Sequence, residues 1–337
     1  MTENACCFNF SASYSGGGLK RLYAYAQWFH DHGGAWFIIH PKCRFLSDEF
    51  PNNHYHVVHL TQMQRLFDDG MYLREFETKG FKPHLYYSYG IPIDRPIGAV
   101  NWFHLSNILP FGTSGIPLSL FQKIKQAYLG RKIFQHEKNA DIISAESRFS
   151  LNLLHPSHSA KLCLSVNGSD DEMGAEFSAA EAKENIAIAV GTYSYKALED
   201  AYLVYNMLHQ SHEALRFMII GDESMIPRRL KKKKGQVIIA GNQPRAEVIR
   251  LLKTAKYYLS TTRIENSYNA ASEGIFFADE SYISDIGPHQ ELVASLPHQK
   301  VMLPGLGRPL LHLERNGISS SHLKTWENVI LEMLTMV

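Results

Sequence analysis

The sequence has few cysteines, little net charge and no long apolar run. Its four cysteines include no pair at a metal-ligand spacing, which is typical of a protein from a reduced compartment. A formal net charge of +1 provides no global field that would attract nucleic acid. No apolar run approaches the roughly 18 residues that a membrane span requires. These absences predict a cytoplasmic protein, and they leave open one that binds a membrane surface.

Two common phosphate-binding signatures are also absent. The run Gly16, Gly17 and Gly18 follows a predicted strand and precedes a predicted helix. It is not a GxGxxG motif, because Arg21 stands where the last glycine would be, and no P-loop Gly-Lys-Ser/Thr follows it. Three glycines exceed the needs of a turn, which favours close approach of a ligand to the backbone. A tight strand-to-helix turn is the alternative interpretation.

Length and composition indicate two globular domains. The chain has 337 residues, of which 45% are hydrophobic and 20% charged, and this suits two independent cores. In the first half, apolar segments alternate with amphipathic ones. Strands are predicted at 5–10, 35–39, 56–60, 85–89, 99–103, 141–144 and 161–166, and helices at 19–30, 61–76, 118–139 and 148–154. Such alternation predicts a parallel sheet with helices on its faces.

The alternation restarts after a segment at 167–185 that is rich in Gly, Ser, Ala and acidic residues. Strands are then predicted at 186–190, 215–220, 237–240, 257–259, 282–284 and 301–303, and helices at 198–210, 245–255, from about 268, and 319–337. We therefore predict an N-terminal domain at 1–166, a linker at 167–185 and a C-terminal domain at 186–317. The final helix, 318–337, is expected to pack back on the N-terminal domain.

Two carboxylates mark one corner of the second predicted sheet. Glu265 and Glu273 are separated by seven residues across a strand–loop–helix junction. Open α/β sheets bind ligands beyond the carboxyl ends of their strands, and a helix start there offers N–H groups to an anion. The pair is suited to acid–base catalysis or to accepting hydrogen bonds from sugar hydroxyls. The alternative is one carboxylate on a loop and one on a helix surface, and spacing alone does not decide.

The motifs and their order resemble those of retaining glycosyltransferases of the GT-B fold, specifically glycosyltransferase family 4. Glu265 and Glu273 fit the Glu-x7-Glu motif of that family, with Ser284-Asp285 and Glu291 at the matching offsets. Further resemblances span nearly the whole chain: Gly16–Gly18, His104, Asn167-Gly168, Val190-Gly191, Lys196, Gly221-Asp222 and Gly241.

The chain departs from the family at three places. The family's Gly-x-Pro before the final strand is replaced at 278–280 by Ala, Asp and Glu. The usual Phe-Gly after the first glutamate is replaced by Asn266, Ser267, Tyr268 and Asn269. Thr192 stands where an arginine is common, so the diphosphate would be held by one cation instead of two.

The resemblance implies a role for each matching residue. Glu273 is expected to accept hydrogen bonds from the ribose and Glu265 to contact the transferred sugar, while His104 would bind a sugar hydroxyl or the reacting centre. The remaining candidates would bind the donor and neutralise its diphosphate: Gly16, Gly17, Gly18, Gly191, Lys196, Gly241, Asn266, Ser267, Tyr268 and Asn269. A core histidine at 104 and a surface lysine at 196 are the alternatives.

The resemblance further implies two Rossmann-like domains that face across a cleft. The expected reaction transfers a sugar from a UDP- or GDP-sugar to a hydroxyl of a glycan, lipid-linked and of O-antigen or capsule type, with retention. No Asp-x-Asp pair, which would hold a metal on a diphosphate, occurs in the chain, so no metal or other cofactor is expected. The basic, aromatic-rich helix predicted at 118–139 is a candidate for contact with the inner leaflet.

Two other functions remain open at this point. A nucleotide-sugar epimerase or hydrolase of the same fold would need no acceptor. A degenerate transferase could act as a non-catalytic binding subunit, and the changes at Thr192 and at 266–269 motivate that alternative.

Overall fold

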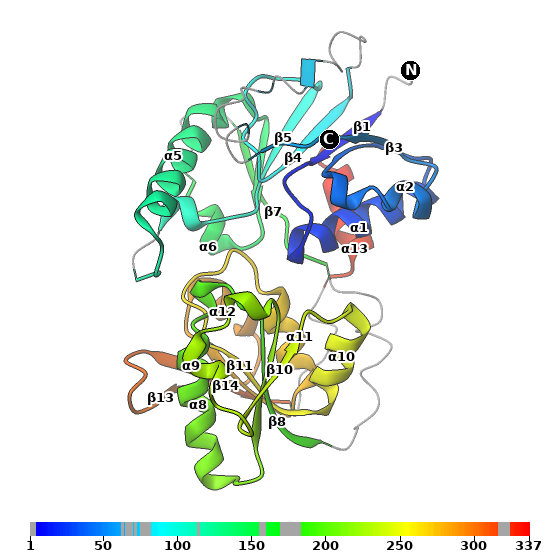
Figure 1. The fold of residues 1–337 in the computed structure, drawn as a ribbon. Helices are drawn as coiled ribbons and strands as arrows, with labels where there is room; N and C mark the ends of the chain where they lie inside the picture. Colours follow the sequence, from blue (N-terminus) through cyan, green and yellow to red (C-terminus); the bar gives the residue numbers. More distant parts are fainter. Residues whose placement is uncertain are drawn as a thin grey trace. The chain divides into compact units, whose positions relative to one another are not determined.

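The computed structural model describes residues 5–61, 64, 70, 73–74, 82–112, 115–154, 160–168, 183–315 and 324–337. The chain forms two compact units. The first comprises Met1–Gly112, Leu120–Ser169 and Lys324–Val337, and the second Thr113–Ser119 and Asp170–Leu323. Each unit contains a seven-stranded sheet with helices on both faces (Figure 1). Two α/β domains are therefore confirmed.

All strands of the first sheet are parallel, in the order β3-β2-β1-β4-β5-β6-β7. They are β1 (Cys6–Phe10), β2 (Trp36–Ile39), β3 (His54–Val57), β4 (Leu85–Tyr89), β5 (Val100–Leu105), β6 (Ile142–Ala145) and β7 (Lys161–Leu164). The chain moves outward from β1 to β3 and then returns past β1 to β4. The loops after β1 and β4 therefore diverge at the carboxyl edge, which makes this a topological switch point.

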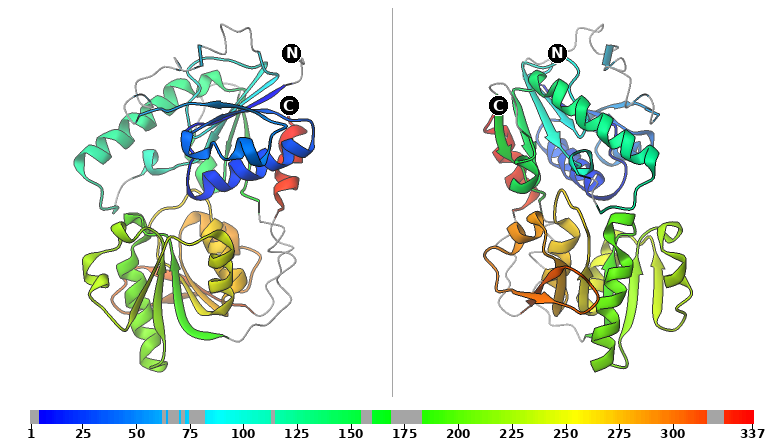
Figure 2. Two further views of the ribbon diagram at one scale, coloured as in Figure 1. Left: turned by 45° about the vertical axis from the view of Figure 1, so that its right-hand side comes forward. Right: turned by 90° about the vertical axis from the view of Figure 1, so that its left-hand side faces the viewer.

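The core of the first unit includes side chains of the last helix. Alternate residues of β1, Phe8 and Phe10, face α1 (Gly16–Asp31) and are fully buried against Tyr25. The last helix, α13 (Trp326–Leu334), adds Trp326 and Ile330 to the same core and lies beside α1 in both views (Figures 1 and 2). The C-terminal helix is thus part of the first unit. The opposite face of the sheet carries α5 (Leu120–His136) (Figure 1).

The second sheet has the order β10-β9-β8-β11-β12-β14-β13. Its strands are β8 (Glu184–Val190), β9 (Arg216–Ile220), β10 (Val237–Gly241), β11 (Ala255–Ser260), β12 (Glu280–Ser284), β13 (Gln299–Met302) and β14 (Pro309–Glu314). The five strands from β10 to β12 are parallel. Here the switch point lies between β8 and β11.

An antiparallel hairpin, β13–β14, closes one edge of the second sheet. The sequence analysis predicted only the first of these strands and so missed the hairpin. The signal was present: Pro304, Gly305 and Gly307 separate two short apolar runs, and both glycines have a positive φ. Leu311 and Leu313 of β14 are buried in the core of the unit.

Helices cover both faces of the second sheet. Ala187 and Phe217 pack against α8 (Leu198–Ser211) on one face. Ile186 and Tyr258 pack on the other face against α10 (Arg245–Thr254), α11 (Asn269–Phe277) and α12 (Gly287–Val293). The α/β alternation of the sequence reflects these two buried faces. The shorter helices are α2 (Leu46–Glu49), α6 (Arg148–Leu151) and α9 (Arg228–Lys231).

Several predicted boundaries differ from the structure. Helix α1 begins at Gly16, so the three glycines form its first turn and do not form a loop before it. Helix α5 is shorter than predicted and continues as a 3-10 turn, Glu137–Asn139. Most of the helix predicted at 61–76, most of the linker and the start of the last helix lie outside the described residues. Nothing in the described part of the chain is a helix long and apolar enough to cross a bilayer.

Candidate functional site

The switch point of the second sheet brings together two of the predicted site residues. Lys196 ends a 3-10 turn, Ser194–Lys196, that follows β8, and Glu265 lies on the loop that follows β11. Because β8 and β11 are neighbours, the two side chains meet and form an ion pair. Their side chains are 14% and 18% exposed, so the pair is largely shielded from water.

The side chain of Lys196 lies close to the backbone of Gly191. Gly191 has φ +95°, and a Cβ on it would lie 3.1 Å from Cε of Lys196. Ala197 adopts a left-handed conformation with φ +50°, which is uncommon for a residue with a side chain. The Thr261 hydroxyl donates to the Lys196 and Ala197 carbonyl oxygens, at 3.3 and 2.9 Å. These contacts fix the turn that presents the lysine.

Glu273 lies on α11 and is 6% exposed. Nη1 of Arg245, at the start of α10, donates to its carboxylate at 2.6 Å. The next residue, Gly274, lets α11 pack directly on β11, because a Cβ there would lie 2.2 Å from the Tyr258 ring. Burial raises the pKa of Tyr258, and the nearby carboxylates of Glu265 and Glu273 raise it further. Both carboxylates of the Glu-x7-Glu motif therefore flank one buried tyrosine.

The segment 266–269 connects these two glutamates. Asn266 is buried at 9% exposure, and α11 begins at Asn269. The Ser272 N–H donates to the Tyr268 carbonyl at 2.7 Å, closing the first turn of the helix. Helix α11 thus begins shortly after Glu265 in the chain. The free N–H groups at the start of a helix stabilise an anion.

The family's second cation has no counterpart at Thr192. That side chain is 5% exposed, and a Cβ on Gly221 would lie 2.7 Å from its methyl group. The substitution therefore fills a contact between the turns after β8 and β9. Gly241 ends β10, two strands away from the switch point, and its carbonyl accepts from the Gly221 N–H at 2.9 Å. Arg245, which binds Glu273, was not predicted from the sequence.

A buried polar layer supports the loop after β11. The Ser284 hydroxyl contacts two carbonyl oxygens of that segment, Ser260 at 3.0 Å and Thr262 at 2.6 Å. Arg308, the residue before β14, donates to the carbonyl oxygens of Thr261 and Thr262 and to the carboxylate of Asp200. These residues lie far apart in the sequence, and no local pattern marks them as partners.

In the first unit, the glycines lie at the switch point between β1 and β4. A Cβ on Gly18 would lie 2.9 Å from the Ser13 hydroxyl and 3.1 Å from the Tyr89 ring. The small residue is therefore required by close packing of the first turn of α1. Gly16, with φ +61°, has open space around its Cα, and Gly16 and Gly17 are exposed. These two positions have room for a ligand, and Gly18 has a packing role.

His104 is fully buried in the first unit. Its Nδ1 lies 2.7 Å from the Ser144 hydroxyl, and its Nε2 lies 3.6 Å from Oε1 of Glu146. The Tyr89 hydroxyl donates to the same carboxylate oxygen at 2.7 Å. Arg21 is also fully buried, and its charge favours the ionised form of Glu146. The sequence analysis singled out His104 but not the charged network around it.

This network makes the first unit sensitive to acid. Burial and the nearby Arg21 lower the pKa of His104 from 6.5 to about 4. Burial alone would raise the pKa of Glu146, but hydrogen bonding to His104 and the Arg21 charge lower it from 4.5 to about 2. The unfolded chain therefore binds protons that the folded chain does not, first at the histidine below pH 6.5 and then at the carboxylate below pH 4.5.

We expect the free energy of unfolding of the first unit to fall as the pH drops from 6.5 to 4. With about 1.4 kcal/mol for each pKa unit, the His104 contribution is roughly 3 kcal/mol. The four tryptophans, Trp28, Trp36, Trp102 and Trp326, all lie in the first unit, so their fluorescence in urea titrations at several pH values measures it. His104→Asn should flatten the dependence above pH 4.5. An unchanged slope in that variant would contradict the assignment.

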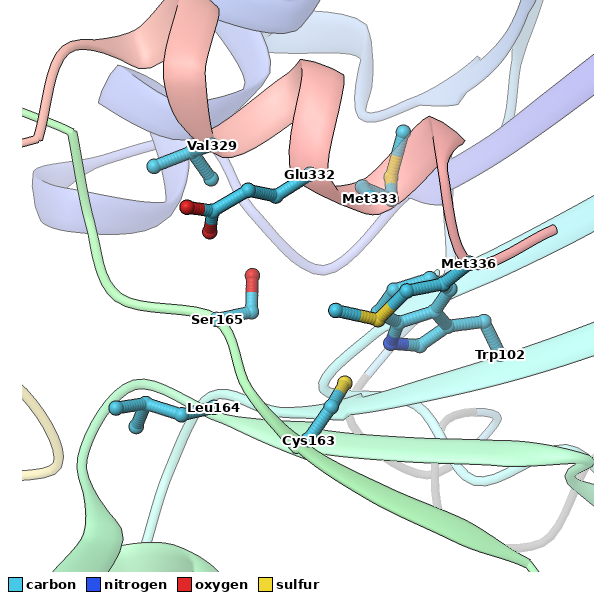
Figure 3. Close-up of a pocket in the computed structure, with 8 residues that line it drawn as sticks. All are labelled: Trp102, Cys163, Leu164, Ser165, Val329, Glu332, Met333 and Met336. Carbon is cyan, nitrogen blue, oxygen red and sulfur yellow. The ribbon is translucent and has the colours of Figure 1, made fainter.

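A small cavity adjoins this network but is not a substrate site. It lies between β7 and α13, and the Ser165 hydroxyl points toward the side on which Glu332 lies (Figure 3). Its volume is ≈ 10 Å³, about that of one water probe. A sugar cannot enter it, so the candidate site remains at the carboxyl edge of the second sheet.

Known proteins are similar to this chain in fold. No protein-family model matches the chain, and no curated protein matches it. Many solved structures do match. The chain is similar to the sucrose-phosphate synthase of Thermosynechococcus elongatus, with a TM-score of 0.67 and 10% identity over 99% of this chain and 98% of that one.

Two further solved structures are also similar to this chain. One is WaaG, a glycosyltransferase involved in lipopolysaccharide biosynthesis, with a TM-score of 0.62 and 8% identity over 86% of this chain and 84% of that one. The other is Anabaena HepE in complex with UDP-glucose, with a TM-score of 0.60 and 14% identity over 86% and 82%. The chain therefore has the GT-B fold of glycosyltransferases, as predicted. At these identities the likeness shows the fold alone.

Proposed function

We propose that this protein is a glycosyltransferase that moves a sugar from a nucleotide-sugar to a hydroxyl of a glycan. The observation that carries the proposal is the meeting of Lys196 and Glu265 at the switch point of the second sheet, with buried Glu273 on the adjoining helix. The fold supports it, and a similar structure was solved with UDP-glucose. Retention at the anomeric carbon is part of the proposal and rests on the resemblance in sequence.

The two carboxylates suit the hydroxyls of a nucleotide-sugar. A buried carboxylate binds a pair of hydroxyls well, because charge-assisted hydrogen bonds are strong where water is excluded. Arg245 donates to the Glu273 carboxylate at 2.6 Å. A ribose would therefore share that carboxylate with the arginine or displace the arginine from it. Glu265 would bind the transferred sugar, and binding would release Lys196 toward the diphosphate.

The leaving group would be stabilised without a metal under this proposal. Lys196 supplies a positive charge, and the start of α11, which follows Glu265 closely in the chain, supplies N–H groups. Preorganised charges and dipoles of this kind stabilise a developing anion because they need no reorganisation during the reaction. Lys196 is the only cation of this set that the sequence analysis assigned to the diphosphate.

For the acceptor, we propose a lipid-linked glycan of O-antigen or capsule type at a membrane surface, with the protein on the cytoplasmic face. Helix α5 exposes large apolar side chains: Leu120, Phe121, Ile124, Tyr128 and Phe134. The same helix carries Lys123, Lys125 and Arg131. It borders a hollow of ≈ 690 Å³ that Phe111, Phe134 and Leu153 help to line. Apolar and basic side chains together favour an anionic lipid surface.

The donor site is tested by thermal shift with UDP-, GDP-, dTDP- and ADP-sugars. A donor present at 100 times its Kd should add about 2.7 kcal/mol to the stability of the folded protein, which raises the midpoint by several degrees. Glu273→Gln should lose most of that shift, because the ribose loses its charged acceptor. Glu213→Gln is the matched control, since this exposed residue lies before β9, at the opposite edge of the sheet.

Three outcomes would redirect the proposal. If no nucleotide-sugar shifts the midpoint at millimolar concentration, the donor site is wrong. If the protein releases free sugar or an isomer from a nucleotide-sugar alone at the rate seen with acceptor glycan, the fold serves a hydrolase or epimerase. A Glu273→Gln variant that fully restores a deletion strain would instead indicate a non-catalytic binding subunit.

A further inference from the structure

A buried histidine lies at the carboxyl edge of the second sheet, close in the fold to the loop that carries Glu265. His289 lies on α12 and is 1% exposed. Its Nδ1 is 2.9 Å from the Ser284 carbonyl oxygen. Within the described residues, its Nε2 is buried and has no hydrogen-bond partner. A buried polar atom of this kind destabilises the fold unless something else binds it.

The contact to Ser284 determines which nitrogen carries the proton. A carbonyl oxygen only accepts, so Nδ1 must be the donor in that hydrogen bond. Burial and then the positive charge of Lys196 lower the pKa of His289 to about 4, so the ring is neutral near pH 7. In a neutral ring with its proton on Nδ1, Nε2 is an acceptor only. A group that binds Nε2 must therefore be a hydrogen-bond donor.

The position of His289 links it to the donor site. The Ser284 hydroxyl binds the Ser260 and Thr262 carbonyls at the end of β11, and the loop after β11 carries Glu265. Thr261, between them, holds the Lys196 backbone. Four residues thus join the histidine to the Lys196–Glu265 pair.

We propose that Nε2 of His289 accepts a hydrogen bond from a hydroxyl of the transferred sugar and so contributes to sugar specificity. This rests on the proposed donor site. Phosphate oxygens are acceptors at neutral pH and would repel the Nε2 lone pair, so the diphosphate is not the partner. The Lys196 ammonium is already bound to Glu265. The ribose hydroxyls are assigned to Glu273, so the donor that we assign to this neutral, buried acceptor is a hydroxyl of the transferred sugar.

The test compares UDP-glucose with UDP by calorimetric titration, or GDP-mannose with GDP if the guanosine ligands bind. His289→Asn keeps an amide that can donate to the Ser284 carbonyl but removes Nε2. We expect it to weaken UDP-glucose binding about tenfold and to leave UDP binding within about twofold. His289→Gln places an amide oxygen near the position of Nε2 and should recover part of the loss. His298→Asn is the control, because that imidazole binds the Leu296 carbonyl near the edge hairpin.

A series of monodeoxy UDP-glucose analogues identifies the hydroxyl. The analogue that lacks it should bind the wild type and His289→Asn equally, whereas the others should still distinguish them. If the wild type binds none of the UDP-, GDP-, dTDP- and ADP-sugars, the proposed function fails. If the wild type binds both ligands and His289→Asn weakens both equally, or neither, the inference about His289 is overturned.

A measurement on the wild type keeps the proposal testable if His289→Asn does not fold. In protein labelled with ¹⁵N-histidine, the Nε2 resonance of His289, assigned through His289→Gln, should move upfield when UDP-glucose binds. It should stay in place when UDP binds. Movement with UDP alone, or with neither ligand, would overturn the proposal, because the acceptor would then not face the sugar.

Discussion

Replacing Lys196 with alanine is expected to lower kcat about 100- to 1,000-fold, the usual cost of removing one group that stabilises a developing anion. Two physical effects add here. The diphosphate loses the cation that we propose for it, and Glu265, with a side chain only 18% exposed, is left without its counter-ion. An unpaired carboxylate at that position repels the departing diphosphate. The expected effect on KM is smaller, because the leaving-group charge develops in the transition state.

Initial rates with the nucleotide-sugar found in the thermal-shift screen measure this prediction. Lys196→Arg should retain part of the activity, because it keeps the charge but changes its geometry. Lys232→Ala, an exposed lysine after α9, controls for the loss of a surface charge. A Lys196→Ala protein that is folded, binds the donor and turns over at the wild-type rate would remove the lysine from the mechanism. The diphosphate would then depend on Arg245 or on the α11 amides.

Replacing Arg21 with methionine is expected to lower the free energy of unfolding of the first unit by about 3–5 kcal/mol. This guanidinium is fully buried and donates to the Ser165 and Val166 carbonyls at 2.8 and 2.9 Å and to the Tyr87 hydroxyl at 3.2 Å. Without it, these oxygens lose a donor and the buried Glu146 loses a balancing charge. Removing one partner of a buried charged network is costly for this reason.

Arg21 also contacts residues close to the points where the chain leaves the first unit after Ser169 and returns to it at Lys324. It binds the Asn167 side chain at 3.3 Å, and its guanidinium lies 5.5 Å from the centre of the Trp326 ring. Trp326 packs in turn against Gly168, where a Cβ would lie 2.6 Å from the indole. We therefore expect Arg21→Met to loosen α13 together with the end of β7.

Urea denaturation followed by tryptophan fluorescence measures this effect, because all four tryptophans belong to the first unit. Arg44→Met, an exposed arginine of the same unit, is the matched control and should change the free energy by less than about 0.5 kcal/mol. Arg21→Lys should be intermediate, since an ammonium cannot reach all of the acceptors at once. A free energy for Arg21→Met within 0.5 kcal/mol of the wild type, again the surface-substitution range, would show that the network is not stabilising.

The sequence was sufficient for the fold because the signals of an α/β protein are local. Strands such as β8 and β9 are continuous apolar runs, and α8 has an apolar face at helical spacing. The hairpin β13–β14 was missed because its strands are short and lie at the edge of the sheet. The exact start of α1 was missed because glycines usually precede a helix and do not begin it.

The candidate site, too, was predicted only in part from the sequence. Spacing and resemblance selected Glu265, Glu273 and Lys196 from the sequence. The partners of those side chains did not follow from it, because Arg245 and His289 reach the site from helices that local patterns do not relate to the glutamates. The same holds for Arg21 and Glu146, whose charges affect each other only after α1 and the end of β6 have packed.

The sequence by itself determined the two-domain α/β architecture, the Glu-x7-Glu pair and the single lysine after β8. These depend on periodicity and spacing, which are properties of the chain before it folds. Only the tertiary structure decided that Lys196 pairs with Glu265, that Glu273 pairs with Arg245 and that Nε2 of His289 is left as a buried acceptor. The order of the strands in the second sheet is the physical reason, because it makes β8 and β11 neighbours although about 70 residues separate their loops.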